Sequence, residues 1–127
     1  MVIKNSPSSV MFIQLRHKSL DFYQAVRDLV KEVYVISLQL PADERFNLVQ
    51  QVRRAAISVK LNFAEGSSRY SKAERKRFNE IARGSLVEID AILETAVDLG
   101  YLEIARLENL IELLNKCFAI LSNMIRP

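Results

Sequence analysis

The sequence contains few of the residues from which enzymes and metal proteins build their sites. It has a single histidine, His17, and a single cysteine, Cys117, so it offers neither a pair of histidines for a metal ion nor an internal disulfide. It also lacks a glycine-rich phosphate loop and any H-E-x-x-H or C-x-x-C motif. We therefore expect no enzymatic activity, no metal and no cofactor. His17 is expected at the surface or at a helix cap, and Cys117 in the core.

Residues that interrupt helices are also scarce. The 127 residues include three glycines, three prolines and no tryptophan, while 50% are hydrophobic and 26% are charged. This composition is typical of a globular domain rich in helix. No segment approaches the ~18–20 consecutive apolar residues of a membrane span, and the N-terminal residues lack the apolar stretch of a secretory signal. We expect one soluble, cytoplasmic domain with no membrane association.

Apolar side chains recur every three or four residues in four segments, which indicates four amphipathic helices. We expect these helices over residues 20–40, 43–65, 72–99 and 102–126. Because the connections between them are short, neighbouring helices should be antiparallel. The predicted fold is therefore all-α, an antiparallel up-down-up-down four-helix bundle over residues 17–127, preceded by a loose N-terminal arm over residues 1–16.

Local signals set the expected ends of these helices. Ser19 is the expected N-cap of the first helix, and Ser71 with Glu74 forms an S-x-x-E capping box for the third. Gly66 and Gly100 are the expected C-terminal caps of the second and third helices, because glycine readily adopts the left-handed conformation needed there.

The apolar positions of each helix fall on one face, which we expect to be buried. The expected buried positions include Phe46, Phe78, Ile81, Ile111 and Phe118. Two further apolar residues of the second helix, Ile57 and Leu61, lie away from its buried face. We expect these two to contact another copy of the chain.

The charges are segregated along the chain. Residues 45–83 carry ten basic and three acidic side chains, a net charge of +7, whereas residues 84–127 carry three basic and seven acidic ones, a net charge of −4. In an up-and-down bundle the basic segment turns at the end where the chain starts and finishes. This end should be basic, and the opposite end should be acidic.

Clustered lysine and arginine favour a phosphate backbone, because binding releases the counterions that surround it. We expect a nucleic-acid-binding surface formed by Arg69, Lys72, Arg75, Lys76 and Arg77, with Arg83, Arg53 and Arg54 as further contacts. RNA is favoured over DNA as the partner. Two alternatives remain: the charges belong to an ordinary solvated helix start, or Arg53 and Arg54 pair with Glu80 or Glu88.

Small and polar residues near the middle of the sequence allow two interpretations. Asn62, Glu65 and Gly66 could contact a ligand, but a structural role at the helix end is favoured. Gly84 and Ser85 place small side chains inside a helix, where they allow either close packing within the chain or close contact between subunits.

The middle of the sequence also carries a specific pattern. Residues 46–102 contain R-R-A-A-x-S, N-x-A-E-G, S-x-x-E, I-A-x-G-S-L-x-E and L-G-Y-L in that order. This region resembles the four-helix-bundle family of the 23S rRNA intervening-sequence proteins. One departure is Lys60, at a position where members often carry proline, so a kink there is in doubt. Residues 1–16 have no counterpart in the pattern.

The resemblance implies a non-enzymatic bundle that assembles into a ring, with a pentamer favoured. Relatives include the accessory protein of diversity-generating retroelements, which partners a reverse transcriptase and nucleic acid. The resemblance therefore leaves two expectations open: direct nucleic-acid binding, or a scaffold whose basic end meets a protein partner.

Overall fold

The computed structural model describes residues 12–127, so most of the expected N-terminal arm, residues 1–11, lies outside the described part. In the described part the chain forms no strand, and its α-helices are α1 (Asp21–Ser37), α2 (Leu48–Ser67), α3 (Lys72–Asp98) and α4 (Glu108–Ile125). Short 3-10 turns lie ahead of three helices: η2 (Arg16–Ser19), η3 (Ala42–Glu44) and η4 (Ile104–Arg106). The chain is a four-helix bundle, as the apolar spacing predicts.

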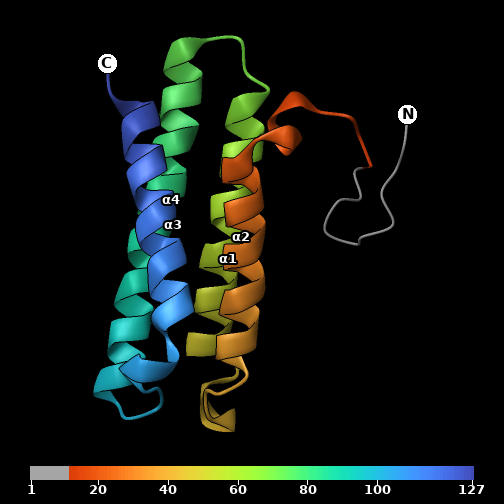
Figure 1. Ribbon diagram of the computed structural model, residues 1–127. Coiled ribbons are helices and arrows are strands. Elements are labelled where there is room, and N and C mark those ends of the chain that lie inside the picture. The colour runs from red at the N-terminus through yellow and green to blue at the C-terminus, as the bar shows by residue number, and fades with distance from the viewer. Residues whose placement is uncertain (1–11) are drawn as a thin grey trace.

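The connections lie at two opposite ends of the bundle. The start of α1, the α2–α3 loop and the end of α4 lie at one end, and the α1–α2 and α3–α4 connections lie at the other (Figure 1). Side chains join elements within each end: Lys72 and Arg126 line one groove, and the Tyr101 hydroxyl donates to Glu44 Oε2 over 3.2 Å. We call the first end the tip (residues 16–20, 63–79 and 122–127) and the second the base (residues 38–48 and 97–108).

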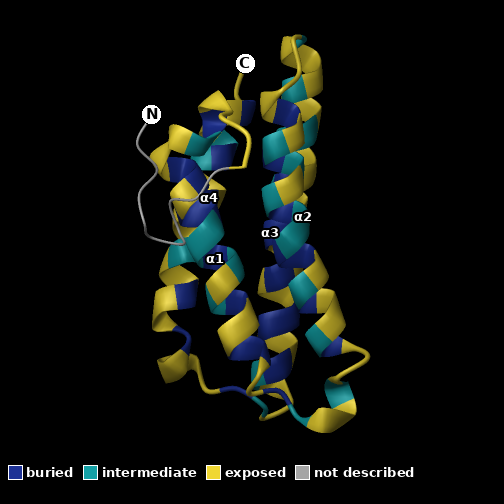
Figure 2. Cartoon of the chain, turned by 90° about the vertical axis from the view of Figure 1, so that its right-hand side faces the viewer, coloured by how far each residue is buried: buried dark blue, intermediate teal, exposed yellow. Residues whose placement is uncertain are grey.

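The core lies between the four helices and draws side chains from each of them (Figure 2). Its largest fully buried apolar side chains are Leu29, Ile89, Leu110, Leu121, Val26, Val33, Val52 and Val59. Cys117 is fully buried on α4, and this burial raises the pKa of its thiol to about 11. The expectation that Cys117 behaves as a small core residue is confirmed.

The α2–α3 pair is the most extensive helix contact in the bundle. The two helices carry small buried residues, Ala55 and Ala56 on α2 and Ala82 on α3. The Ser85 hydroxyl donates to the Ser58 hydroxyl over 2.8 Å across the contact. Ser85 therefore serves packing within the chain, whereas Gly84 is exposed and a Cβ at its position would meet nothing within 4 Å.

Gly66 does not cap α2, contrary to the sequence-based expectation. The helix continues to Ser67, and Gly66 is buried within its last turn. A Cβ at Gly66 would lie 2.7 Å from Phe78 Cβ, closer than real side chains approach. The glycine is needed for the close approach of α2 to the start of α3. The sequence alone could not distinguish this role from a cap, because both require glycine near a helix end.

Gly100 is a true C-terminal cap, as predicted. Its φ of 79° is left-handed, and the backbone closes in a Schellman motif: the Tyr101 N–H donates to the Ala96 carbonyl over 2.8 Å and the Gly100 N–H to the Val97 carbonyl over 2.9 Å. At the other end of α3, the Ser71 hydroxyl oxygen accepts from the Glu74 N–H over 3.2 Å. The predicted N-cap is therefore also confirmed.

Other predicted boundaries were wrong by part of a turn to more than a turn. Ser19 does not cap α1; its hydroxyl instead donates to the Arg16 carbonyl within η2, and Leu20 is the N-cap residue. The second helix starts at Leu48 rather than at residue 43, because residues 42–44 form the 3-10 turn η3. The fourth starts at Glu108 after η4. In each case a short 3-10 turn precedes the α-helix and continues the helical spacing of the sequence, so the helix was predicted to start too early.

Several expected core positions are exposed. Phe46 lies ahead of α2 and is 77% exposed, because the helix that would have turned it inward starts two residues later. Ile81, Ile111 and Phe118 are each about 40% exposed on α3 and α4, and Phe78 is half-buried. The apolar faces of α3 and α4 therefore extend beyond the core, and part of each face is exposed.

Candidate nucleic-acid interface

Several side chains hold the tip loop, residues 68–71, and Arg75 makes two of the contacts. Arg75, half-buried in the second turn of α3, donates from Nη1 to the carbonyl oxygens of Arg69 (2.9 Å) and Tyr70 (2.6 Å). Two charge-assisted hydrogen bonds fix the backbone of the loop. Arg75 therefore has a structural role in addition to the charge that the sequence assigns to it.

Arg69 lies against the neighbouring helix rather than projecting freely. Its guanidinium is 5.2 Å from the centroid of the Phe78 ring, and its Nη2 lies 3.6 Å from Glu65 Oε1. Both side chains of this ion pair are substantially exposed, so the pair orients Arg69 more than it stabilises the fold. Glu65 thus has a structural contact at the helix end, and Asn62 likewise donates to the Ser58 carbonyl.

Three basic residues of α3 at the tip are exposed. In the described part of the chain, Lys72, Lys76 and Arg77 make no ion pair and no hydrogen bond through their side chains. Lys72 and Lys76 line a groove of about 670 Å³ between the start of α3 and the end of α4, together with Arg126. Arg77 does not line this groove, because it projects from a different side of α3.

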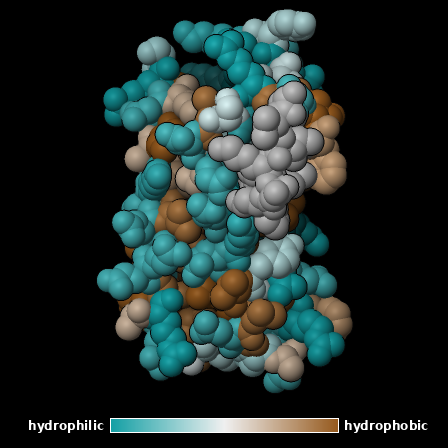
Figure 3. Space-filling view, turned by 45° about the vertical axis from the view of Figure 1, so that its right-hand side comes forward, coloured by the Kyte–Doolittle hydropathy of each residue, from teal (hydrophilic) through white to brown (hydrophobic). Residues whose placement is uncertain are grey.

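A second groove adjoins the first across the tip. It has a volume of about 290 Å³ and is lined by residues of η2, α2, α3 and α4, including Arg16, His17 and Phe63. Arg75, Asn79 and Met124 line both grooves. In the part of the chain that the structure describes, no aspartate or glutamate lines either groove. The uppermost part of the face in Figure 3 is hydrophilic, whereas hydrophobic residues gather toward the base and at the upper right.

His17 is buried, contrary to the expectation of a surface or cap residue. It is 7% exposed and makes edge-to-face contacts with Tyr23 and Phe63, with ring centroids 4.9 and 6.0 Å away. Its Nε2 is buried, and none of the described residues is its hydrogen-bond partner. Burial, and secondarily the positive charge of Lys18, lowers the pKa of the imidazole. The turn η2 carries this residue inward. The sequence did not predict this, because a single histidine ahead of a helix does not indicate whether its side chain is buried.

Three arginines of the predicted site lie away from the tip. Arg53 donates from Nε to the Ser37 hydroxyl over 2.8 Å and lies 4.6 Å from the centroid of Tyr34, joining α2 to α1. Arg83 donates to the Ser122 hydroxyl over 3.2 Å and joins α3 to α4. Arg54 is exposed on α2, three turns or more from the tip loop. Within the described residues, neither Arg53 nor Arg54 pairs with Glu80 or Glu88.

The structure adds a basic group that sequence reasoning missed. Lys60 Nζ lies 5.8 Å from the centroid of Tyr23, on the side of the bundle formed by α1 and α2. Burial lowers the pKa of Lys60, and the nearby positive charges of Arg27 and Lys18 lower it further. These three cations come from separate elements, so only the packing of α1 against α2 brings them together.

The base carries the opposite charge. Its turns hold acidic side chains, among them Asp43, Glu44 and Glu103. Burial, followed by the charge of Glu44 and its hydrogen bond, raises the pKa of the Tyr101 hydroxyl. The ends of the bundle therefore differ in sign.

The fold and its surface define a class of protein: a small four-helix bundle with a basic tip and an acidic base. In the described part no group of three or more metal-ligating side chains is assembled, and no helix is long and apolar enough to cross a membrane. The chain belongs to the 23S rRNA-intervening sequence protein family, whose model matches residues 18–123. A comparison with curated proteins finds no match.

Proposed function

We propose that this protein is a non-enzymatic, cytoplasmic homo-oligomer that binds nucleic acid, with structured RNA favoured, through its basic tip. The observation that carries the proposal is the pair of adjoining grooves across the tip, which are lined by Arg16, Lys72, Arg75, Lys76 and Arg126 and, among the described residues, by no aspartate or glutamate. An up-down-up-down course of the helices, which we infer from the position of the connections, explains why residues from both ends of the chain meet there.

The proposed binding mode is recognition of the phosphate backbone. Lys72 and Lys76 are exposed and unpaired in the described structure, so phosphates can replace their water and counterions without breaking a contact in the protein. Tyr70 projects from the loop between Arg69 and Ser71 and is fully exposed. It offers one surface on which an unpaired base can stack, which favours RNA loops over regular duplex.

Self-association is the second part of the proposal. Leu61 is 61% exposed and Ile57 is half-buried on the outer side of α2, where they cover no part of the chain's own core. We propose a ring, with a pentamer favoured from the family resemblance. A ring repeats the tip once per subunit, and several weak phosphate sites then act together.

Salt titration of RNA binding tests the first part. With a fluorescent RNA hairpin as the probe, we expect the slope of log K against log salt to fall by roughly 2–3 in the variant Lys72→Ala/Lys76→Ala/Arg126→Ala. The matched control removes three exposed charges away from the tip: Arg45→Ala/Arg106→Ala/Lys116→Ala. Equal slopes in the tip variant and the wild type would refute the proposal, as would a wild type that does not bind at low salt.

The alternative is a scaffold whose tip meets an acidic protein, such as a subunit of a reverse transcriptase. Affinity capture from lysate with and without nuclease treatment separates the two functions. A partner that survives nuclease and is lost in the tip variant would favour the scaffold. A partner that disappears with nuclease would favour nucleic acid.

A further inference from the structure

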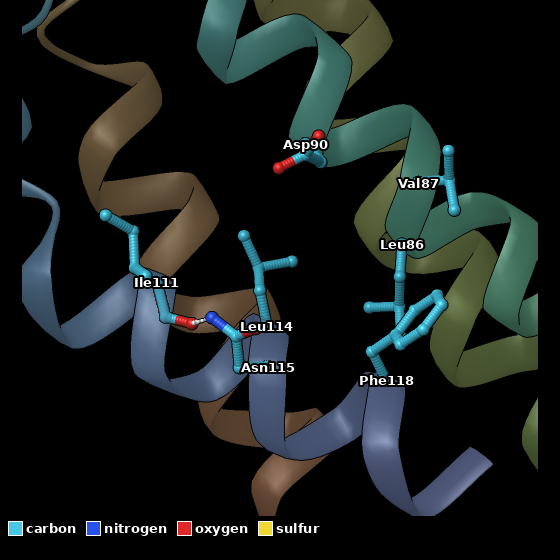
Figure 4. A pocket seen from close by; sticks show the side chains of 7 residues that line it. All are labelled: Leu86, Val87, Asp90, Ile111, Leu114, Asn115 and Phe118. Atoms are coloured by element: carbon cyan, nitrogen blue, oxygen red, sulfur yellow. Dashed lines mark hydrogen bonds between the residues drawn. The ribbon is translucent and has the colours of Figure 1, made fainter. Parts of the chain in front are cut away.

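The contact between α3 and α4 leaves a groove along the side of the bundle, away from the tip. Its upper part, about 320 Å³, is lined by Leu86, Val87, Ile111, Leu114 and Phe118, with Asp90 at its edge (Figure 4). Its lower part, about 280 Å³, continues toward the base and shares Asp90, Ile111 and Leu114. In Figure 4 Leu86 of α3 and Phe118 of α4 lie next to each other across the opening.

The upper part of the groove is apolar apart from Asp90 and Asn115, and charged side chains of α3 lie on either side of it. Val87 is 54% exposed on α3, and Phe118 is 42% exposed on α4. Toward the base, the rim carries Asp90 and Glu94. Toward the tip, it carries Arg83, whose guanidinium lies 5.7 Å from the centroid of the Phe118 ring. From base to tip, α3 thus presents a negative, then an apolar, then a positive group.

The outer side of α2 presents the complementary order. Arg54, Ile57, Leu61 and Glu65 follow one another at intervals of three or four residues, so they form one ridge. From base to tip this ridge is positive, apolar and negative. It lies on a different side of the bundle from the groove, so the two cannot meet within one copy.

The spacings of the two surfaces also agree. Arg54 and Glu65 are 11 residues apart on α2, and Glu94 and Arg83 are 11 residues apart on α3, about 16 Å in each helix. When Arg54 is placed opposite Glu94, Glu65 falls opposite Arg83, and Leu61 falls opposite Val87. The reversed alignment places like charges together at both ends, which disfavours it.

We propose that the α2 ridge of one copy of this chain docks in the α3–α4 groove of a second copy, with the two tips pointing the same way. The apolar residues supply most of the attraction, because exposed ion pairs contribute little beyond setting the alignment. Such a contact is heterologous, so a pair of copies retains one free groove and one free ridge for further neighbours. It would therefore gather the basic tips on one face of the assembly.

This inference rests on the self-association part of the proposed function and is independent of nucleic-acid binding. Sedimentation of the full chain at tens of micromolar tests it with Val87→Glu, which blocks the groove, and Leu61→Glu, which blocks the ridge. We expect each variant alone to associate at least about tenfold more weakly than the wild type. Val35→Glu is the matched control, because Val35 on α1 is also 54% exposed; we expect it to assemble normally. Circular dichroism confirms that each variant is folded.

Mixing the two blocked variants distinguishes a groove-to-ridge contact from every symmetric one. In the mixture, one copy retains an intact ridge and the other an intact groove, so we expect 1:1 dimers and nothing larger. If Val87→Glu assembles like the wild type, or if the mixture stays monomeric, the inference is wrong while self-association stands. If the wild type itself is a monomer, self-association and this contact fail together, and the RNA titration is still interpretable.

The charged ends are tested in the same assay. Arg54→Glu and Glu94→Arg should each raise the dissociation constant, and the double variant should recover most of the loss because the pair is restored with reversed signs. A double variant that is weaker than both single variants would exclude the proposed alignment.

Discussion

The two contacts that α3 makes with its neighbours are built differently. Against α2 it presents alanine and serine, and the two backbones come so close that Gly66 leaves no room for a Cβ beside Phe78. Against α4 it presents larger side chains, and an open apolar groove remains between the helices. Small residues thus close one contact, and larger residues leave a groove at the other.

Of the substitutions that test this difference between the two contacts, Gly66→Ala is expected to change the stability most. Gly66→Ala should lower the free energy of unfolding by about 1–3 kcal/mol, because the new Cβ overpacks the α2–α3 contact. Gly84→Ala is the control in the same pair of helices: its Cβ meets nothing within 4 Å, so it should stabilise the protein by about 0.5–1 kcal/mol through helix propensity. Urea denaturation measures both. A neutral Gly66→Ala would show that α2 and α3 can separate at no cost.

A smaller loss is expected at the serine pair. Ser85→Ala removes the donor to Ser58 in a buried contact and should cost about 1 kcal/mol. Thr95→Ala provides the comparison, because its hydroxyl donates to a carbonyl of its own helix at an exposed position and should have little effect. Equal losses in the two variants would mean that the Ser58–Ser85 bond contributes nothing to the closed contact.

The folding stability should depend on pH through His17, which is buried at the tip. Burial lowers the pKa of the folded imidazole below its ordinary value of 6.5, so the unfolded chain binds the proton more readily than the folded one. Stability contributed by His17 is therefore full above that value and decreases as pH falls through it toward the folded pKa. Thermal denaturation from pH 8 to pH 5 measures the slope, and His17→Phe should flatten it. An unchanged slope in that variant would assign the pH dependence to other groups.

The smallest change in stability is expected for a substitution at the α3–α4 groove. Val87→Ala removes a half-exposed side chain and should change the stability of a single copy by no more than about 0.5 kcal/mol. The measurement belongs in the Leu61→Glu background, where copies do not associate through the ridge. A loss of about 2 kcal/mol there would show that Val87 supports its own core, and the α3–α4 side would then be less open than described.

The sequence predicted the helices better than the contacts between them. Apolar spacing located all four helices, and Ser71 and Gly100 behaved as their local chemistry predicts. Gly66 was assigned to the wrong role because a C-terminal cap and a close contact between helices both require glycine near a helix end. Phe46 was misplaced because a 3-10 turn continues the helical spacing for a few residues.

The candidate site was predicted in part. The basic residues next to the loop lie at the tip, but Arg53 and Arg83 are occupied in contacts between helices, which only the packing could reveal. His17 was missed because nothing in the sequence indicates that η2 turns it inward. The α3–α4 groove was also missed, since its residues follow the same apolar spacing as true core positions.

The bracing of the loop by Arg75 divides the charges of the tip into fixed and mobile ones. The guanidinium of Arg75 is held against two backbone carbonyls, whereas Lys72 and Lys76 carry their ammonium groups on long flexible stems. Under the proposed function, an anion that approaches this end would meet the mobile charges first and the fixed charge only after it had settled in the groove. Attraction and discrimination would then depend on different side chains.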